Sequence, residues 1–333
     1  MPGTKYDVVA IGNAIVDIIG RCEDGFLDKH AAPKGHMRLV ETATIDTIYG
    51  DMGPGIEISG GSAANTAAGV ASLGGRAAFI GKVADDEFGR IFRHDIRAAG
   101  VAFETPAAED SGLATSRSLI LVTPDGQRTM NTYLGISTAF GRAEVDPAVI
   151  EASRIVYLEG YLFDREEAKG AFREALQIAK AAGRQVALTL SDSFCVDRHR
   201  AEFLELIRGG IDILFANESE ILSLYETTSF DDAVGRVARD TKLAVLTRSE
   251  QGSVVISEGE LVQVAPDAVA KVVDTTGAGD LYAAGFLFGL ARGDDFATAG
   301  RFGSFAAAEI IGQIGARPEV KLSHLARMRG LVG

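Results

Sequence analysis

Alternating blocks of apolar and polar residues along the chain predict an α/β protein. Short apolar runs typical of buried strands occur at 8–11, 76–83, 154–160, 185–190, 211–217, 243–248, 253–257 and 261–265. Segments with apolar residues at helical spacing fall at 60–75, 85–100, 165–182, 198–208, 218–225, 230–239, 280–292 and 295–312. This order predicts a doubly wound, mostly parallel central sheet with helices on both faces.

A second group of segments is half polar and rich in β-branched residues. Stretches at 15–22, 35–42, 115–123 and 127–134 have this pattern, and the last two flank the turn "PDG", as expected for a hairpin. They predict a small β-sheet outside the main core, which we expect to form a lid. No linker-like stretch or internal repeat interrupts the chain, so we expect one domain, 1–333, with this lid.

Composition and charge exclude several functions. The formal net charge is −13, which argues against a nucleic-acid groove or an anionic membrane surface as partner. Cys22 and Cys195 give neither a disulfide framework nor a metal-ligand spacing. No signal peptide and no run long enough to span a bilayer can be read, so a cytoplasmic protein is expected.

The stretch "DTTGAGDLYAAGF" (274–286) holds the most informative chemistry. Asp280 stands where a helix begins, directly after Gly277-Ala278-Gly279. Unpaired amides and the macrodipole make such a turn a site for an anion, and glycines let it approach. Asp280 is either a helix cap or a base beside a phosphoryl group; the turn alone leaves both open.

Two other phosphate motifs fail on spacing. "GRAAFIGKV" (75–83) has one residue too many for a Walker A loop, and it ends in valine. "GAGDLY" (277–282) has tyrosine where a dinucleotide fingerprint needs its third glycine, and helices rather than a strand follow. A dehydrogenase is therefore disfavoured. A catalytically silent binding protein would be expected to lack Asp280 or the glycines.

The 274–286 stretch resembles the C-terminal signature of the PfkB, or ribokinase-like, carbohydrate and nucleoside kinases. "GGSAANTAAGVASLGGRAAFIGKVADDEFG" (60–89) is similar to that family's N-terminal signature, "NESE" (217–220) to its N-x-x-E motif, and "LTRSEQGSVV" (246–255) to its nucleotide-binding strand and turn. The resemblance spans nearly the whole chain. It implies a ribokinase-like fold, ATP and Mg²⁺, and transfer of a phosphoryl group to a primary hydroxyl.

The resemblance also implies roles for individual residues. Asp280 corresponds to the catalytic base, and the amides of Gly277, Ala278 and Gly279 to the anion hole. The implied acceptor-site residues are Asn13, Asp17, Gly60, Gly61 and Asn65, with Arg128 of the lid reaching the transferred phosphate. The implied nucleotide-site residues are Asn217, Thr247, Ser249 and Gly252. Glu220 would organise Mg²⁺ through water, and the backbone of Asp274 and Thr276 a monovalent cation such as K⁺.

The chain departs from the family at two nucleotide-site positions, which carry Arg248 where an apolar residue is usual and Ser249 in place of glycine. The half-polar strands at about 14–20, 36–44 and 114–134 match the lid of that family, a β-sheet that closes over the acceptor. In many relatives the lids also pair into dimers, so a homodimer through the lid is an open expectation.

The acceptor is the least determined part. "GNAIVDII" (12–19) and "GGSAANTA" (60–67) resemble the adenosine kinase-like branch, whereas ribokinase tends to carry lysine at the position of Ser62. Tyr133, Tyr161, Leu162 and Phe163 could line a nucleobase or belong to the core. The sequence favours adenosine, with AMP as product; a fructokinase, ribokinase or ketodeoxygluconate kinase remains the alternative.

Overall fold

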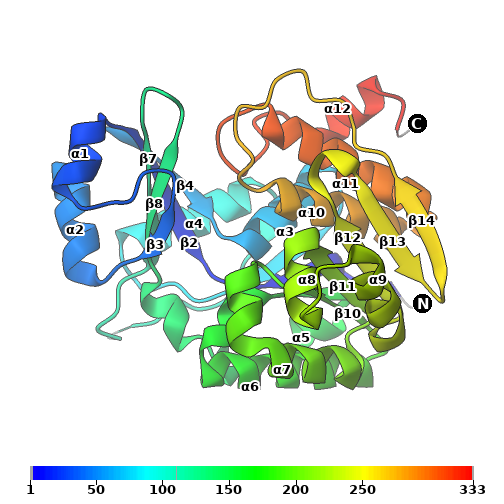
Figure 1. Ribbon diagram of the computed structural model, residues 1–333. Helices are drawn as coiled ribbons and strands as arrows, with labels where there is room; N and C mark the ends of the chain where they lie inside the picture. The colour runs from blue at the N-terminus through cyan, green and yellow to red at the C-terminus, as the bar shows by residue number, and fades with distance from the viewer. Residues whose placement is uncertain (1–2, 110, 332–333) are drawn as a thin grey trace.

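A nine-stranded sheet forms the centre of the molecule (Figure 1). The structure, a computed structural model, describes residues 3–109 and 111–331. The strand order of this main sheet is β14-β13-β12-β11-β10-β9-β1-β5-β6. Neighbouring strands are parallel except for the β12–β13 and β13–β14 pairs at one edge, which are antiparallel. The strands are β1 (Tyr6–Ile11), β5 (Ala77–Ile80), β6 (Val101–Ala102), β9 (Ser153–Glu159), β10 (Gln185–Thr189), β11 (Ile213–Asn217), β12 (Leu243–Thr247), β13 (Ser253–Ser257) and β14 (Glu260–Val264). The predicted fold class is confirmed.

Helices cover both faces of this sheet, because its strands are apolar on both sides. Within β1, Val8 and Ala10 belong to one apolar core, and Val9 and Ile11 to the other, as the two-residue period of a strand requires. The first core contains residues of α3 (Ser62–Ser72), α4 (Glu87–Ala98), α10 (Ala278–Arg292), α11 (Phe296–Ile311) and α12 (Leu322–Met328). The second contains residues of α5 (Pro147–Glu151), α6 (Glu166–Ala181), α7 (Ser193–Gly210), α8 (Glu218–Tyr225) and α9 (Phe230–Asp240).

Four 3₁₀ turns complete the main body: η1 (Gly135–Ala139), η2 (Arg142–Glu144), η3 (Gly160–Asp164) and η4 (Ser249–Gln251). Helix α10, which begins at the glycine-rich turn, is buried along most of its length between the sheet and α11. The two helices can touch closely because Gly285 has no side chain: a Cβ there would overlap the carbonyl oxygen of Phe302. This packing holds the start of α10, and therefore Asp280, in place.

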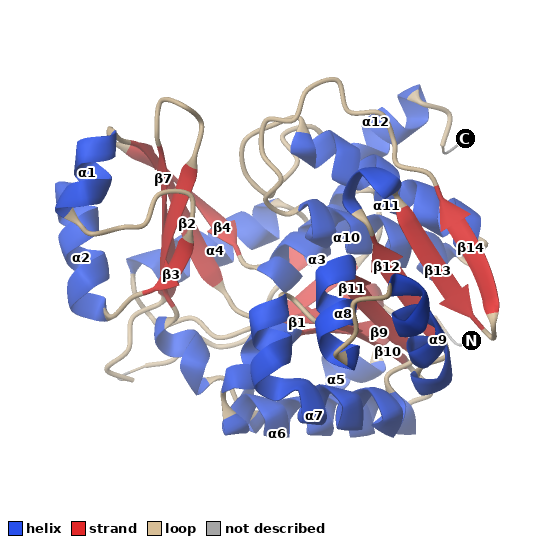
Figure 2. Cartoon of the chain, in the orientation of Figure 1, coloured by secondary structure: helices blue, strands red, loops and turns tan. Residues whose placement is uncertain are grey.

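A five-stranded sheet stands beside the main body (Figure 2). Its order is β3-β8-β7-β2-β4, with β3 (Met37–Leu39), β8 (Arg128–Tyr133), β7 (Ser116–Val122), β2 (Ile15–Arg21) and β4 (Gly55–Gly60). Helices α1 (Asp24–Lys29) and α2 (Thr42–Asp51) lie on its outer side (Figure 1). Strands β7 and β8 pair antiparallel, as predicted for the hairpin.

Two details of this second sheet differ from the predicted segments. Residues 42–44 begin helix α2 rather than continuing a strand, because Ile45 and Ile48 form a buried stripe at helical spacing. Strand β4 lies outside the predicted segments; its glycines and exposed Ile56 gave it no clear strand pattern. β4 pairs with β2, so that Ile58 lies opposite Asp17.

Two smaller observations concern the described residues. None of their helices combines the length and the apolarity needed to cross a membrane. Cys22 and Cys195 are both free thiols.

Candidate active site

The predicted site residues gather at the carboxyl end of the parallel strands. The strand order reverses between β1 and β9, which is where ligands bind in open α/β sheets. Asn13 follows β1, and Glu159 ends β9. The Nδ2 of Asn13 donates to Glu159 Oε1 at 2.6 Å, and the amide of Ala63 donates to Glu159 Oε2 at 2.7 Å.

Glu159 is a buried carboxylate, 1 % exposed, that the sequence did not single out. It ties the loop after β1 to the start of α3. Burial raises its pKa to about 7, although three N–H donors from Asn13 and Ala63 oppose that shift. Its only signal in the sequence was an acidic residue at the end of an apolar run.

Asp280 lies in the first turn of α10 and faces the start of α3. Ser62 Oγ donates to Asp280 Oδ1 at 2.6 Å, and Asn65 Nδ2 donates to Asp280 Oδ2 at 3.0 Å. Residues more than 200 positions apart, the two signatures noted in the sequence, therefore meet at one carboxylate. Ser62 is a second partner that sequence reasoning did not assign to this site.

Electrostatics at this carboxylate combine opposing effects. Desolvation raises the pKa of Asp280, while the hydrogen bonds from Ser62 and Asn65 and the charge of Arg317 lower it. Both carboxylate oxygens are already oriented by donors, and each keeps a further lone pair for a substrate hydroxyl. Asp280 is not the cap of its helix, because Gly277 holds that position and the Asp280 side chain bonds α3 instead.

Asp17, on β2 of the second sheet, is held beside the two glycines that begin the α3 signature. A side chain at Gly60 would overlap Asp17 Oδ2, and one at Gly61, whose φ is +96°, would overlap the carbonyl oxygen of Asn13. Burial raises the pKa of Asp17 to about 7, with Asp280 adding to the shift and Arg317 and Arg128 opposing it. The acceptor-side residues thus form one cluster around Asp17 and Asp280.

The glycine turn has the shape of an anion site, with one amide already used. Gly277 has a φ of +78° and caps α10, and the amide of Ala278 donates to Thr275 O at 3.2 Å. The amide of Gly279 belongs to the first helical turn, where no intrahelical partner is available. A Cβ at Gly279 would meet no atom of the described residues within 4 Å, so the space above this turn is open.

Arg128, at the start of β8, reaches the loop that leads into this turn. It is ion-paired with Asp274, and its Nη1 lies 3.4 Å from Thr276 Oγ1. The Asp274 carboxylate also accepts from the amides of Thr276 and Gly315, at 3.0 and 2.9 Å. Because its side chain is surrounded by donors, only backbone carbonyls of Asp274 and Thr276 are left for a monovalent cation.

The predicted nucleotide-site residues lie together at the ends of β11 and β12, where Asn217 pairs with Thr247. Asn217 caps α8 and exchanges hydrogen bonds with Glu220: its amide donates to Oε2 at 2.9 Å and its Nδ2 to Oε1 at 2.6 Å. Ser249 has a left-handed backbone, with φ +49°. Gly252, with φ +80°, leaves no room for a side chain, which would overlap Val264 O.

The donor set at Glu220 fits a magnesium ion bound through water and phosphate. Among the described residues, no group of three or more His, Cys, Asp or Glu side chains could hold a metal by itself. Mg²⁺ keeps several waters and needs one or two carboxylates besides phosphate oxygens. Burial raises the pKa of Glu220 to about 7, with Asp192 and Asp280 contributing, so nearby negative charge favours a cation.

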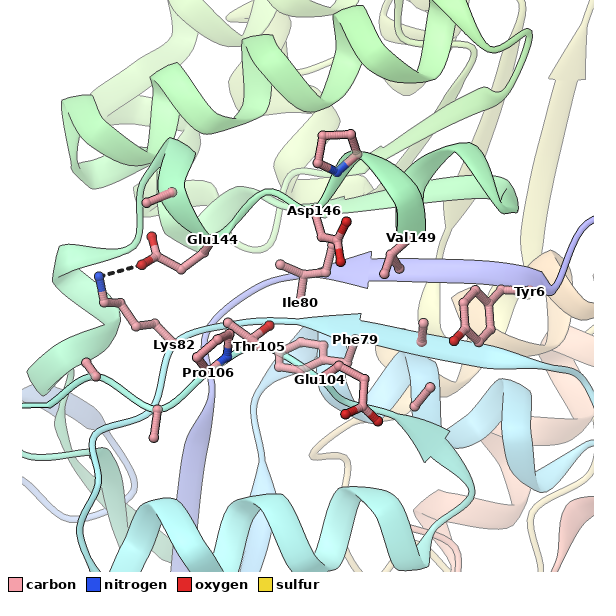
Figure 3. Close-up of a pocket in the computed structure, with 16 residues that line it drawn as sticks. Tyr6, Phe79, Ile80, Lys82, Glu104, Thr105, Pro106, Glu144, Asp146 and Val149 are labelled. Carbon is pink, nitrogen blue, oxygen red and sulfur yellow. Dashed lines mark hydrogen bonds and ion pairs between the residues drawn. The ribbon is translucent and has the colours of Figure 1, made fainter.

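A separate cavity of about 590 Å³ lies beside β5 and β6, at the edge of the main sheet opposite β14 (Figure 3). Lys82 and Glu144 form an ion pair of 2.6 Å at its wall. None of the predicted site residues lines it.

Comparison with known proteins identifies the family to which the chain is similar. Residues 57–321 match the model of the pfkB family carbohydrate kinases. The chain is 56 % identical to adenosine kinase from Sinorhizobium meliloti, with a TM-score of 0.90 over 98 % of this chain and 99 % of that one. It is 48 % identical to a probable sugar kinase protein from Rhizobium etli CFN 42, with a TM-score of 0.92 over 99 % and 100 %. A 5-dehydro-2-deoxygluconokinase from Shouchella clausii is 27 % identical over 93 % of this chain and 90 % of that protein.

The fold and the comparisons define an ATP-dependent kinase of small molecules. The chain belongs to the pfkB family, and its similarity to adenosine kinases supports the predicted adenosine kinase-like branch. Its acceptor is a sugar or a nucleoside, and ATP, with Mg²⁺, is the implied donor.

Proposed function

We propose that the chain transfers the γ-phosphoryl group of ATP to the primary hydroxyl of adenosine, giving AMP and ADP. The observation that carries this proposal is the position of Asp280. Its carboxylate is oriented by Ser62 and Asn65 of the acceptor side and stands at the helix start that offers the open glycine turn.

In this mechanism Asp280 acts as general base. The acceptor hydroxyl donates to Asp280, loses its proton to the carboxylate as the oxygen attacks the γ-phosphorus, and ADP leaves in line. Phosphoryl transfer asks the protein mainly for positioning and for stabilisation of negative charge. The glycine turn of 277–279 and the start of α10 provide that stabilisation at the transferred group.

Residues on either side position the two substrates. Asp17 accepts hydrogen bonds from the vicinal hydroxyls of the acceptor, a geometry that suits one carboxylate. Asn217, Thr247 and the η4 turn bind the nucleotide, and Glu220 would hold Mg²⁺ through water. That ion, when bound, would neutralise negative charge on the phosphates of ATP.

Arg128 and the second sheet cover the site. The Arg128 guanidinium is paired with Asp274 and lies next to Thr276, the residue before the glycine turn. When a phosphoryl group is bound at the turn, this guanidinium adds positive charge beside it. Closure of a lid excludes water and limits hydrolysis of ATP.

Recognition of a nucleobase is supported by aromatic residues at the ends of β9 and β10. Phe194 is 73 % exposed at the start of α7, and the loop before it is fixed by Asp192, which accepts from the amide of Cys195 at 2.6 Å. Tyr161, whose hydroxyl donates to Ser191 O at 3.2 Å, lies on the neighbouring turn. An exposed ring held on a rigid turn suits stacking against a base.

Not every aromatic candidate in the sequence remains available for this role. Leu162 and Phe163 are buried in the core, where Phe163 stacks on Phe203 with ring centroids 4.6 Å apart. Tyr133 is also buried, close to Arg117. Phe194 was missed because a single phenylalanine after "LSDS" has no pattern that distinguishes it from a core residue.

A sugar kinase is the second candidate. The similarity to a probable sugar kinase protein and to a 5-dehydro-2-deoxygluconokinase favours it, and Asp17 would serve a sugar diol equally well.

Two finer features belong to the same proposal. Met37 and Leu39 expose apolar side chains on the edge strand β3, which supports a homodimer formed through the second sheet. Backbone carbonyls of Asp274 and Thr276 would hold a K⁺ ion. Equal rates of phosphorylation in KCl and in choline chloride would contradict this K⁺ site.

The test is a panel of acceptors. ADP release with Mg-ATP is measured against adenosine, other nucleosides, fructose, ribose and 2-keto-3-deoxygluconate, with the product identified by chromatography. Adenosine is expected to give the highest kcat/KM, with AMP as product. A sugar preferred over every nucleoside would replace the proposal by its alternative.

A further inference from the structure

Arg317 is a buried arginine beside the residues of the proposed acceptor site. It lies in the loop between α11 and α12, and its Nε donates to Asn65 Oδ1 at 2.8 Å. Its Nη2 is buried and has no hydrogen-bond partner within residues 3–109 and 111–331. A buried donor without a partner is rare in native proteins and calls for an explanation.

The bond to Asn65 fixes which way that amide points. An amide side chain carries one acceptor oxygen and one donor nitrogen. Since Oδ1 accepts from Arg317, Nδ2 is turned toward Asp280, to which it donates at 3.0 Å. Arg317 thus acts on Asp280 through Asn65.

Arg317 also acts on the acceptor site through its charge. Its guanidinium attracts Asp17, Asp95 and Asp280. Burial lowers the pKa of Arg317 to about 10, so it remains a cation at neutral pH. The other ionisable groups that act on Asp280 or are acted on by it are Asp17 on β2, Tyr157 and Glu159 on β9, Tyr161 in η3 and Glu220 in α8.

All of those other groups are acids, and those that ionise make a negative Asp280 less favourable. Arg317 is the cation that lowers the pKa of Asp280 and, with Arg128, that of Asp17. Its unpaired Nη2 therefore belongs to a guanidinium held near both the diol-binding carboxylate and the base.

We propose that Arg317 is a further acceptor-site residue: its Nη2 donates a hydrogen bond to an oxygen of the bound acceptor, while its Nε and its charge keep Asp280 oriented and ionised. The ligand class is a polyhydroxylated acceptor, a sugar or the ribose of a nucleoside, bound between Asp17 and Asp280. This inference rests on the proposed role of Asp280 and adds a binding contact to it.

The experiment compares Arg317→Gln and Arg317→Lys with Arg327→Gln, a matched change at an exposed arginine of α12. Steady-state kcat and KM are measured for both substrates across pH, and acceptor binding is measured by calorimetry. Loss of a charged hydrogen bond is expected to raise the acceptor KM and Kd of Arg317→Gln by ~10-fold to ~100-fold, with the KM for ATP near that of wild type.

The pH profile separates the two parts of the role. The base must be ionised, so removing the cation in Arg317→Gln should move the acidic limb of kcat/KM to higher pH. Arg317→Lys keeps the charge but not the forked geometry, so its acidic limb should stay while its acceptor KM rises. If Arg317→Gln does not fold, the result for Arg317→Lys decides.

The opposite results would overturn the inference. An acceptor KM unchanged in Arg317→Lys, or in Arg317→Gln, contradicts the direct contact, and an acidic limb unmoved in Arg317→Gln contradicts the electrostatic part. The measurements use whichever acceptor of the panel is turned over best. If that acceptor is not adenosine, the proposed substrate fails while the test of Arg317 stands unaffected.

Discussion

Arg128 of the second sheet is ion-paired with Asp274 in the loop that leads to the glycine turn. The Asp274 side chain is 3 % exposed and that of Arg128 11 % exposed, so the pair joins the second sheet to the loop before α10 away from water. Any movement of the second sheet relative to the main body must either break this ion pair or move the loop of Asp274 with it. The second sheet and the loop that leads to the glycine turn are therefore mechanically connected.

Replacing Arg128 by glutamine should destabilise the protein and slow the reaction. Removal of one partner leaves the Asp274 charge buried without its cation, a change that costs on the order of 3–5 kcal/mol. Arg21→Gln, an exposed arginine of the same sheet, is the control. Urea denaturation and kcat are measured together. An unfolding free energy equal to that of Arg21→Gln would show that the pair carries no such stabilisation.

Gly60→Ala should act on the acceptor and not on ATP. The new methyl group would overlap the Asp17 carboxylate, and a displacement of about 1 Å in a positioning group costs up to ~10²-fold in kcat/KM. Gly50→Ala in α2, where a Cβ meets nothing within 4 Å of the described residues, is the matched control. If both variants show wild-type kcat/KM for the acceptor, Asp17 does not position it.

Phe194→Ala should weaken binding of a nucleoside but not of a sugar. Stacking of a base on an aromatic ring contributes ~1–3 kcal/mol, which corresponds to ~5-fold to ~150-fold in KM. Leu261→Ala, another exposed apolar residue, on the edge strand β14, serves for comparison. The decisive quantity is the ratio of the KM values for adenosine and ribose. A ratio that does not change removes Phe194 from base recognition.

The sequence predicted the main sheet, the hairpin of the second sheet and the turn that holds Asp280, because each has a local pattern. Glu159, Ser62 and Phe194 could not be assigned in the same way. Their roles depend on contacts between distant segments, or on the exposure of one ring, which neither periodicity nor spacing encodes. Helix α2 and strand β4 were missed for a different reason. Their patterns are short and mixed, and pairing with β2 rather than local preference makes β4 a strand.

Stability should depend on pH through Glu159. Burial raises its pKa in the folded protein to about 7, above the ordinary value of 4.5. The folded state therefore binds a proton at the Glu159 carboxyl group more tightly than the unfolded state does. The contribution is fully present below pH 4.5 and is lost as the pH rises through 7.

The measurement is urea denaturation of wild type and Glu159→Gln from pH 4.5 to 8. The free energy of unfolding of wild type minus that of the variant should fall as the pH rises. Glu205→Gln, at an exposed position of α7, should give a difference that does not vary with pH. A difference for Glu159→Gln that stays constant or increases would contradict the raised pKa.

The role of Asp280 as base is the central claim, and Asp280→Asn tests it most directly. Asparagine keeps the shape of the side chain and can still bond Ser62 and Asn65, but it cannot take the proton of the acceptor hydroxyl. We predict that single-turnover phosphorylation of the best acceptor falls by ~10²–10⁴-fold while ATP binds with nearly unchanged affinity. A rate close to that of wild type, with both substrates bound, would contradict the account.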